Sequence, residues 1–188
     1  MISNSNNAIN IVLAESLKEL AEKKAIEKIT IKEITDKAGV IRPTFYNHFQ
    51  DKYELIEWII SYELLEPITP LLHAGMTFEA IVLMLTNIQK SETFYKKAMK
   101  MEGPVLFHDI AMKAACEVFF QIFQEKSTGN GKYTWLTPER ASTYYAQLVC
   151  FITESWIKQG MDDLEPRQMA EVYMYLINNS MEDVMNDL

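Results

Sequence analysis

The chain has few of the residues on which several large classes of protein depend. Its 188 residues include two cysteines, Cys116 and Cys150, too few for a disulfide framework or a cysteine-rich zinc site. A reduced, cytoplasmic setting is the expectation that follows. No run of roughly 18 uncharged apolar residues occurs, so we expect no membrane-spanning helix. Residues 1–7 also lack the basic and apolar regions of a signal peptide.

Groups that carry catalysis are sparse as well. The three histidines, His48, His73 and His108, are far apart and show no metal-ligand spacing. Neither cysteine has a base beside it, and the glycines of residues 128–132 lack the length and context of a phosphate-binding loop. We therefore expect no enzyme, no cofactor and no metal.

The sequence is rich in helical periodicity instead. Six glycines and six prolines fall between periodic segments rather than within them, and no alternating pattern lasts long enough for a sheet. An apolar stripe marks a first helix at Ile9, Leu13, Leu17, Leu20 and Ala21. Further helices are predicted over about 31–38, 42–49, 51–65, 77–90, 92–101, 104–126, 138–159 and 166–186, with a loop at 127–132. The predicted fold is all-α.

Residues 30–49 hold the most specific pattern. Thr30 and Glu33 have the spacing of a capping box at the start of one short helix, and Gly39 can adopt the positive φ that ends it. A second short helix follows after three residues, which is the spacing of a helix-turn-helix. The apolar positions fit a small three-helix core: Ile31, Ile34, Ala38, Val40, Phe45 and Phe49.

The outward positions of this segment suit DNA. Arg42 can reach guanine or a phosphate, Asn47 can pair with adenine, and Thr44 offers a hydroxyl and a methyl group. Hydroxyl, imidazole and ammonium groups elsewhere in the segment or just after it can contact phosphates. Two of these groups, on Thr30 and Lys52, lie at the start of a helix, where exposed N–H groups favour an anion. The expected DNA-binding residues are Thr30, Arg42, Pro43, Thr44, Tyr46, Asn47, His48 and Lys52.

Residues 29–34, 38–40, 44–49 and 51–55 together resemble the TetR family of bacterial transcription regulators. The resemblance implies an N-terminal helix-turn-helix domain and a C-terminal helical domain for ligand sensing and dimerisation. It also implies a homodimer on a pseudo-palindromic operator of double-stranded DNA. We place the domains at residues 1–58 and 59–188.

Residues 14–20 and 51–59 resemble a narrower branch, the DhaS type, which is linked to control of dihydroxyacetone kinase operons. That branch implies a kinase-subunit-like coactivator protein as an alternative to an unknown small-molecule effector. One position departs from the family pattern. Ile41 stands where the family has Ser, Thr or Asn at the start of the recognition helix, so a helix cap of about 1 kcal/mol is lost.

The net charge of −8 is unevenly distributed. Residues 1–58 carry 8 basic and 9 acidic groups, a net charge of −1, and the remainder carries 10 basic and 17 acidic groups, a net charge of −7. A near-neutral N-terminal domain can still present a local basic face to phosphates, because fields at contact distance depend on local placement.

The C-terminal domain is rich in aromatic and methionine side chains, which can line an apolar cavity or simply fill the core. The candidate ligand-binding residues are Phe78, Met84, Phe94, Tyr95, Met99, Phe107, Phe119 and Phe123. Two apolar stripes on the last long helices can bury one another in a dimer or pack within the chain. The candidate dimer residues are Tyr145, Leu148, Ile152, Trp156, Met169, Val172, Tyr173 and Leu176.

The sequence therefore predicts a DNA-binding transcriptional regulator controlled through its C-terminal domain. Two alternatives stay open at this stage: a protein-interaction adaptor whose helix-turn-helix no longer reads DNA, and a small-molecule binding protein without DNA affinity.

Overall fold

The structure, a computed structural model, describes residues 3–128 and 132–188. Both ranges are built from helices and contain no strand, as the sequence predicted. The elements are α1 (Ser3–Lys23), the 3-10 turn η1 (Ile26–Lys28), α2 (Ile31–Ala38), α3 (Arg42–Tyr46), α4 (Lys52–Ile60), the π-turn η2 (Ser61–Leu65), α5 (Glu66–His73), α6 (Thr77–Lys90), α7 (Glu92–Ala98), α8 (Phe107–Lys126), α9 (Pro138–Lys158), α10 (Pro166–Asn178) and α11 (Met181–Asp187). Across the described residues, no helix combines the length and the apolar character needed to span a bilayer.

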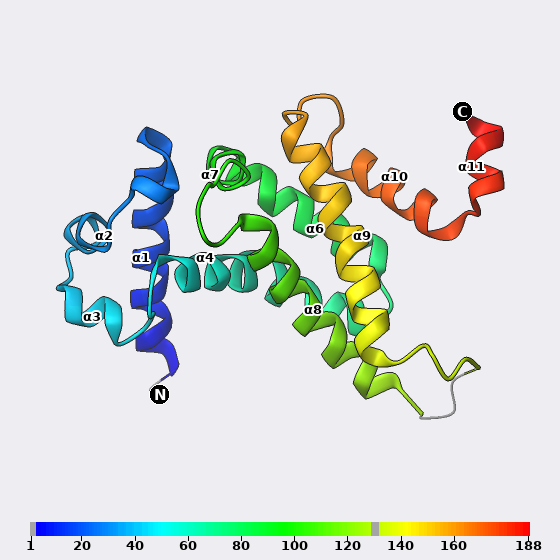
Figure 1. Ribbon diagram of the computed structural model, residues 1–188, viewed down its shortest axis with the longest axis horizontal. Coiled ribbons are helices and arrows are strands. Elements are labelled where there is room, and N and C mark those ends of the chain that lie inside the picture. The colour runs from blue at the N-terminus through cyan, green and yellow to red at the C-terminus, as the bar shows by residue number, and fades with distance from the viewer. Residues whose placement is uncertain (1–2, 129–131) are drawn as a thin grey trace.

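Four elements, α1, η1, α2 and α3, form an N-terminal unit at one end of the molecule (Figure 1). The predicted stripe on α1 is confirmed, because Leu13, Leu17 and Ala21 are fully buried. Residues four apart lie on one face of a helix, so these side chains pack with Ile34 of α2 and Phe45 of α3 in the buried core. Helices α2 and α3 lie on the side of α1 that faces away from the rest of the molecule (Figure 1).

The sequence predicted that the helix leaving this unit would end before Pro67, and this prediction is wrong. The helix continues from α4 through η2 into α5. The Glu66 N–H bonds to the Ser61 carbonyl, five residues back, which widens the turn. Proline has no N–H for the carbonyl four residues before it, and that carbonyl, of Glu63, accepts a hydrogen bond of 3.0 Å from Asn87 Nδ2 instead. A side chain from another helix therefore replaces the bond that Pro67 cannot make.

Two predicted helices are shorter than expected where they meet. Helix α7 ends at Ala98 rather than at residue 101, and α8 starts at Phe107 rather than at residue 104. Gly103 has φ +141°, which no helix accommodates. Met101 is buried from this irregular segment, so the core takes up its side chain without a helix.

The predicted final helix, 166–186, is two helices. Asn179 is extended, with φ −113° and ψ 149°, and separates α10 from α11. The Ser180 hydroxyl accepts from Asp183 N at 3.2 Å, and the Asp183 carboxylate accepts from Ser180 N at 2.9 Å. This reciprocal capping starts α11. The predicted loop 127–132 lies between α8 and α9, and its residues 129–131 fall outside the described part of the chain.

One continuous buried core runs from α1 to α10. Helix α4 lies between the N-terminal unit and the rest of the molecule (Figure 1). Glu57 of α4 forms an ion pair of 2.7 Å with Lys113 of α8, and Lys18 of α1 pairs with Glu63 of η2 at 2.6 Å. The predicted domain division at 58/59 falls inside α4 and stays a prediction.

Candidate nucleic-acid interface

The turn between α2 and α3 depends on Gly39. Its backbone is left-handed, with φ 69° and ψ 26°, and its N–H bonds back to the last turn of α2. The next amide, of Val40, donates to the Thr35 carbonyl at 3.0 Å. These two bonds satisfy carbonyls that the end of a helix leaves open, and the chain then turns directly into α3.

Helix α3 is much shorter than the predicted range 42–49. It ends at Tyr46, and the following amides of Asn47 and His48 close a tight turn onto Pro43 and Phe45. Phe45 is fully buried and Phe49 nearly so, with ring centroids 5.8 Å apart. The short helix is therefore held by the burial of these aromatic rings rather than by its own length.

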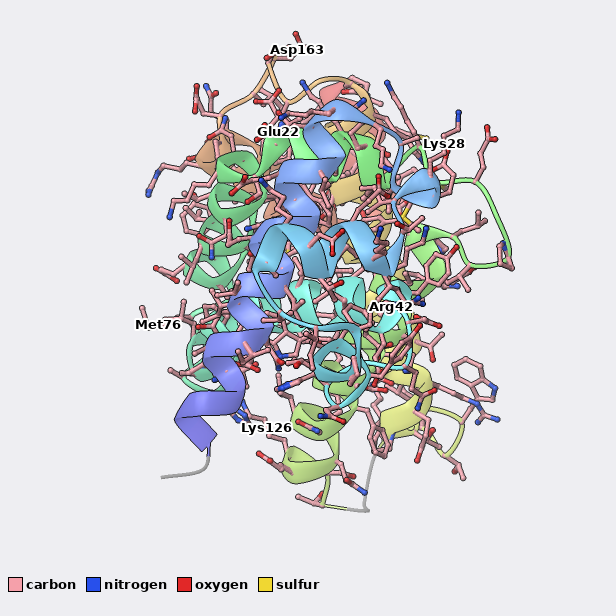
Figure 2. All side chains as sticks on the ribbon, turned by 90° about the vertical axis from the view of Figure 1, so that its left-hand side faces the viewer. Glu22, Lys28, Arg42, Met76, Lys126 and Asp163 are labelled. Atoms are coloured by element: carbon pink, nitrogen blue, oxygen red, sulfur yellow. The ribbon has the colours of Figure 1, made fainter. Side chains whose placement is uncertain are left out.

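The opposite face of α3 is open to solvent. Arg42, Pro43, Tyr46 and Asn47 are exposed, whereas Thr44 and His48 are half-buried. The Arg42 guanidinium lies 3.5 Å from the Tyr46 hydroxyl, one helical turn further on. Figure 2 looks onto the N-terminal unit and shows Arg42 on the face turned to the viewer. The structure thus gathers the predicted residues of α3 on one surface.

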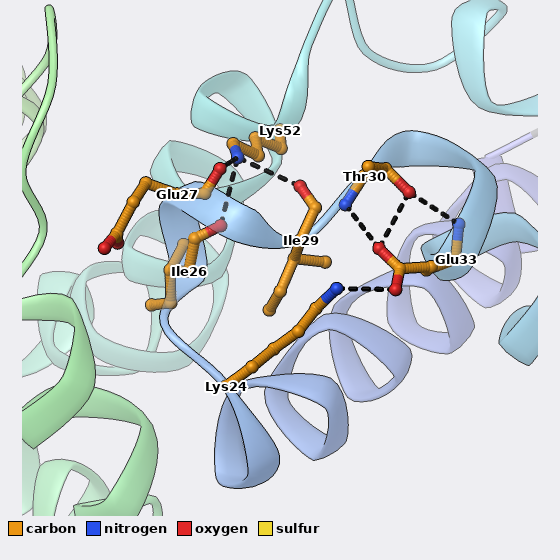
Figure 3. A network of polar contacts seen from close by, with 7 residues as sticks. All are labelled: Lys24, Ile26, Glu27, Ile29, Thr30, Glu33 and Lys52. Atoms are coloured by element: carbon orange, nitrogen blue, oxygen red, sulfur yellow. Dashed lines mark hydrogen bonds and ion pairs between the residues drawn. The ribbon is translucent and has the colours of Figure 1, made fainter.

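Lys52 has a different role from the phosphate contact that the sequence predicted. Its ammonium donates to the carbonyls of Ile26 at 3.0 Å, Glu27 at 2.7 Å and Ile29 at 2.9 Å (Figure 3). An ammonium group has three donors, and all three are used here. Partial burial lowers the pKa of Lys52. The side chain therefore fixes the turn that leads into α2 and has no donor left for DNA.

Thr30 is the N-cap of α2, as predicted, and belongs to a polar cluster (Figure 3). Its amide and hydroxyl both donate to Glu33 Oε2, at 2.9 and 2.8 Å. Lys24, the residue that follows α1, donates to the other oxygen of Glu33 at 2.5 Å. Lys24 and the Thr30 groups hold the pKa of Glu33 at about 2. The start of α2 is thus tied to the end of α1.

Ile41 and two lysines are exposed on this end of the molecule, and the sequence reasoning missed the two lysines. Ile41 is 68% exposed at the start of α3 and, as expected, provides no side-chain cap. Lys28 in η1 and Lys32 in the first turn of α2 are exposed cations. The signal for the two lysines was their place two residues before and two residues after the Thr30 cap.

The predicted ligand residues divide between two cavities and the packed core. Met84, Tyr95 and Phe107 line a cavity of about 50 Å³, and Met84 and Phe119 line a neighbouring one of about 260 Å³. The other four line neither cavity, which corrects the prediction: Phe78, Phe94, Met99 and Phe123. Their rings and thioether pack elsewhere; Phe78, for example, lies under the Arg167 guanidinium.

The predicted dimer residues are mostly turned inward, which corrects that assignment. Ile152, Trp156, Met169 and Tyr173 are buried within the single chain, and the Trp156 indole donates to the Leu164 carbonyl at 3.0 Å. Tyr145 and Leu148 are half-buried, whereas Val172 and Leu176 are 40% and 45% exposed. The neighbouring face of α9 is the open one, with Tyr144 58% and Phe151 70% exposed. Two apolar faces lie side by side on α9, and the sequence could not show which of them packs inside.

Two titratable side chains outside the N-terminal unit have distinctive surroundings. His108 Nδ1 lies 2.7 Å from Glu154 Oε1, and burial raises the pKa of Cys150 to about 12. In residues 3–128 and 132–188, no group of three or more His, Cys, Asp or Glu side chains is placed to hold a metal ion.

Comparisons with known proteins agree with this architecture. Residues 14–59 match the family model "Bacterial regulatory proteins, tetR family", and residues 77–179 match the model "Transcriptional regulator C-terminal region". A curated relative, the HTH-type dhaKLM operon transcriptional activator DhaS of Lactococcus lactis subsp. lactis (strain IL1403), is 23% identical over 89% of this chain and 86% of its own.

Solved structures share the fold. The dihydroxyacetone kinase operon activator DhaS superposes with a TM-score of 0.59 at 22% identity, covering 90% of this chain and 92% of its own. NalD, the secondary repressor of the MexAB-OprM multidrug efflux pump in Pseudomonas aeruginosa, gives a TM-score of 0.60 at 19% identity, covering 92% of this chain and 96% of its own. RolR in complex with resorcinol gives a TM-score of 0.54 at 14% identity, covering 96% of this chain and 93% of its own.

Replacing Gly39 tests the turn. Gly39→Ala should lower the free energy of unfolding by about 1 kcal/mol, because an L-residue at this positive φ is strained. The added Cβ would meet no atom within 4 Å, so backbone strain is the whole expected effect. Urea unfolding followed by circular dichroism measures it. Gly39→Asn should lose less free energy of unfolding than Gly39→Ala, since Asn tolerates this conformation. Equal losses of stability in the two variants would contradict the explanation.

The polar cluster at α2 predicts an acid-sensitive contribution to stability. Because the pKa of Glu33 is held at about 2, below its ordinary 4.5, its contribution is present above about pH 4.5 and is lost as the pH falls towards 2. Glu33→Gln should therefore lose less stability than the wild type between about pH 5 and pH 3. Urea midpoints at the two pH values measure this difference, with Glu22→Gln on the exposed surface of α1 as the control. A steeper loss in Glu33→Gln would refute the assignment.

Proposed function

The chain belongs to the TetR family of bacterial regulatory proteins and is a DNA-binding transcriptional regulator, and we propose that it reads its operator with the exposed face of α3. The observation that carries the proposal is that α3, although only five residues long, has one buried face and one exposed face. Phe45 is fully buried, which fixes the helix, while Arg42, Tyr46 and Asn47 stay open to solvent. A short helix held in this way can enter the major groove.

The side chains of this face supply two kinds of contact. Arg42 reads guanine and Asn47 reads adenine through base edges. Tyr46 and His48 contact phosphates, which positions the helix without specifying sequence. The amide and the hydroxyl of Thr30 both donate to Glu33, so Thr30 acts as the cap that positions α2 and not as a phosphate donor. Thr44 and the exposed Ile41 lie at the start of α3, where a methyl group can meet a thymine methyl.

Lys52 contributes to DNA binding as a positioning residue. By holding the carbonyls of Ile26, Glu27 and Ile29, it fixes η1 and therefore the place where α2 begins. The start of α2 carries the exposed cation Lys32, so the place of this cation beside a phosphate depends on the three interior bonds of Lys52.

The regulator acts as a homodimer on a pseudo-palindromic operator in the cytoplasm. The proposed dimer surface is the open apolar face of α9 and α10, which includes Tyr144, Phe151, Val172 and Leu176. Exposed aromatic and aliphatic side chains on adjacent helices mark an interaction site rather than an ordinary surface. Two copies joined there would form a four-helix interface and present two α3 helices to successive half-sites.

The remaining helices, residues 59–188, form the regulatory domain. Two adjoining apolar cavities lie between its helices, and such cavities are the usual sites of small effectors. Control of relatives takes both signs, since one similar protein is named an operon activator and another a repressor. The sign of regulation here depends on where the operator lies.

Alanine substitution on α3 tests the DNA contacts. Arg42→Ala and Asn47→Ala should each weaken binding to the DNA flanking the protein's own gene about 5- to 150-fold, as expected for a lost bidentate base contact of about 1–3 kcal/mol. Mobility shifts at fixed salt measure the affinity. The control is Arg167→Ala, an exposed arginine on α10, which should bind as the wild type does. Unchanged binding by the Arg42 and Asn47 variants would refute this reading surface.

A charge on the open face of α9 tests the dimer. Phe151→Lys should convert the dimer to a monomer, because it buries an unpaired ammonium in the proposed interface. It should leave the fold intact, since Phe151 is 70% exposed in the single chain. Sedimentation measures the mass, and Met76→Lys, at an exposed position near the start of α6, is the control. A Phe151→Lys protein that remains dimeric would place the interface elsewhere.

A further inference from the structure

Helix α11 turns its apolar side to solvent and its polar side to its own chain. Met181, Met185 and the following Leu188 recur at intervals of four and three residues, so they lie on one face. Met181 is 78% exposed and Met185 is 59% exposed. Asp187 lies about 200° around the helix from Met185, and its carboxylate accepts a hydrogen bond from the Tyr175 hydroxyl of α10. A surface helix ordinarily has the reverse arrangement, with its apolar stripe against the core.

Seven residues are too few for α11 to persist on its own hydrogen bonds. Isolated helices shorter than about 12–15 residues are marginal in water. All of Met181–Asp187 is described, and none of these residues is buried. The Ser180–Asp183 cap and the bond from Tyr175 are exposed, and such bonds contribute only modest net stability. The helix therefore needs a surface that covers its methionines.

A second exposed apolar surface precedes α9. Tyr133, Trp135 and Leu136 are all more than half exposed. The Arg140 guanidinium lies 4.8 Å from the centre of the Trp135 ring and donates to the Trp135 carbonyl at 2.8 Å. The Lys132 ammonium lies 5.2 Å from the centre of the Tyr133 ring. Cations thus lie over both rings, while residues 132–136, which we call the aromatic segment, keep most of their apolar surface open.

These two surfaces are complementary in chemistry. Methionine sulfur makes favourable contacts with aromatic rings, so Met181 and Met185 suit the rings of the aromatic segment. The charges are also opposite, because the aromatic segment is flanked by Lys132 and Arg140, whereas α11 carries three carboxylates. Opposite charges favour the encounter and fix the register of two surfaces. The three carboxylates are those of Glu182, Asp183 and Asp187.

The two surfaces lie apart within one chain. In Figure 1, α11 is at the upper right and the aromatic segment at the lower right, with α9 and α10 between them. A two-fold dimer that presents both α3 helices to one duplex has its axis directed from the N-terminal units towards the opposite end of the molecule. Helix α9 crosses that direction (Figure 1). Rotation about the axis therefore exchanges the two ends of α9 and brings α11 of one copy to the side of the partner's aromatic segment.

We propose that α11 of each copy packs its methionines onto the aromatic segment of the partner, so that the dimer is clasped twice outside the α9 and α10 contact. The proposal rests on the proposed function, because it extends the proposed dimer surface. The open apolar surface is continuous in this arrangement: Phe151 of α9 is followed by Val172 and Leu176 of α10 and then by α11. An isologous contact forms in two symmetric copies, so each clasp contributes twice to the affinity between subunits.

Photochemical cross-linking tests which chain α11 contacts. A chain with p-benzoylphenylalanine in place of Tyr133 is mixed in urea with ¹⁵N-labelled wild type, and the two are refolded together and irradiated. Mass spectrometry should find the light benzophenone peptide joined to a heavy peptide, with the link inside residues 181–188. The same analogue at Phe151 should also give light–heavy links, and at Leu106, an exposed residue just before α8, it should give none to residues 181–188. Links that join only light to light would place α11 on its own chain and overturn the proposal.

The contribution of the contact is measured by a double-mutant cycle. Met185→Ala and Trp135→Ala should each raise the dissociation constant of the dimer about 10-fold, as expected when a buried apolar contact is lost. The double variant should raise it by clearly less than the product of the two effects, because both substitutions remove the same contact. Sedimentation over a dilution series measures the constants, and Leu106→Ala is the control. Multiplicative effects of the two substitutions would overturn the contact.

The proposed function is decided by separate measurements. Mobility shifts on operator DNA decide DNA binding, and the mass of the unmodified protein in sedimentation decides the dimer. A protein that binds DNA as a dimer, but gives no light–heavy link to residues 181–188, keeps the proposed function and loses the clasp. A protein that is monomeric at all concentrations refutes the proposed dimer and the clasp together.

Discussion

Burial of Phe45 is the constraint on which the proposed reading surface, the exposed face of α3, depends. A five-residue helix makes too few backbone hydrogen bonds to persist alone, so α3 exists because one ring on its inner side has no exposure to water. The contact continues inward. Phe45 meets Phe49, Phe49 meets Trp58 of α4 at 6.3 Å, and Trp58 stacks on Tyr62 of η2 at 4.6 Å. The same rings that hold α3 therefore connect it to the π-turn at the edge of the cavity.

This connection explains why the N-terminal unit and the rest of the chain share one core. Helix α4 contacts both. The Lys113–Glu57 pair joins α4 to α8, and the Lys18–Glu63 pair joins α1 to η2, which continues α4. A rigid contact of this kind transmits displacement, whereas a flexible linker would absorb it. The break in regular helical bonding at η2 lies where the two sets of contacts meet.

The sequence predicted the helix-turn-helix well because its signals are local. Thr30, Glu33 and Gly39 act within a few residues of one another, and the structure contains the cap and the left-handed turn. Lys52 was misjudged because its partners, the carbonyls at Ile26 to Ile29, lie more than 20 residues earlier in the chain. The continuation past Pro67 was missed for the same reason, since it depends on Asn87. The DNA-contact residues themselves stay predictions.

Burial within a helix was harder to predict than helix position. Helix α9 was placed almost correctly, but the stripe through Ile152 and Trp156 packs inside while Phe151 is exposed. Both stripes are apolar, and only the positions of α8 and α10 determine which one turns inward. The break between α10 and α11 differs in kind, because Ser180 and Asp183 form a local cap that the sequence already contained.

The ion pairs and hydrogen bonds of the N-terminal cations change what the acidic composition implies for DNA binding. Of the eight cations in residues 1–58, four are engaged within the protein: Lys18, Lys24 and Lys37 in ion pairs and Lys52 on three carbonyls. Salt dependence of DNA binding reflects the number of phosphates that a protein neutralises. With half of its N-terminal cations so engaged and a net charge of −7 beyond residue 58, we expect this regulator to neutralise few phosphates per copy. We then expect its affinity to come mainly from base contacts and from pairing two copies, so that binding is selective for sequence rather than for DNA in general.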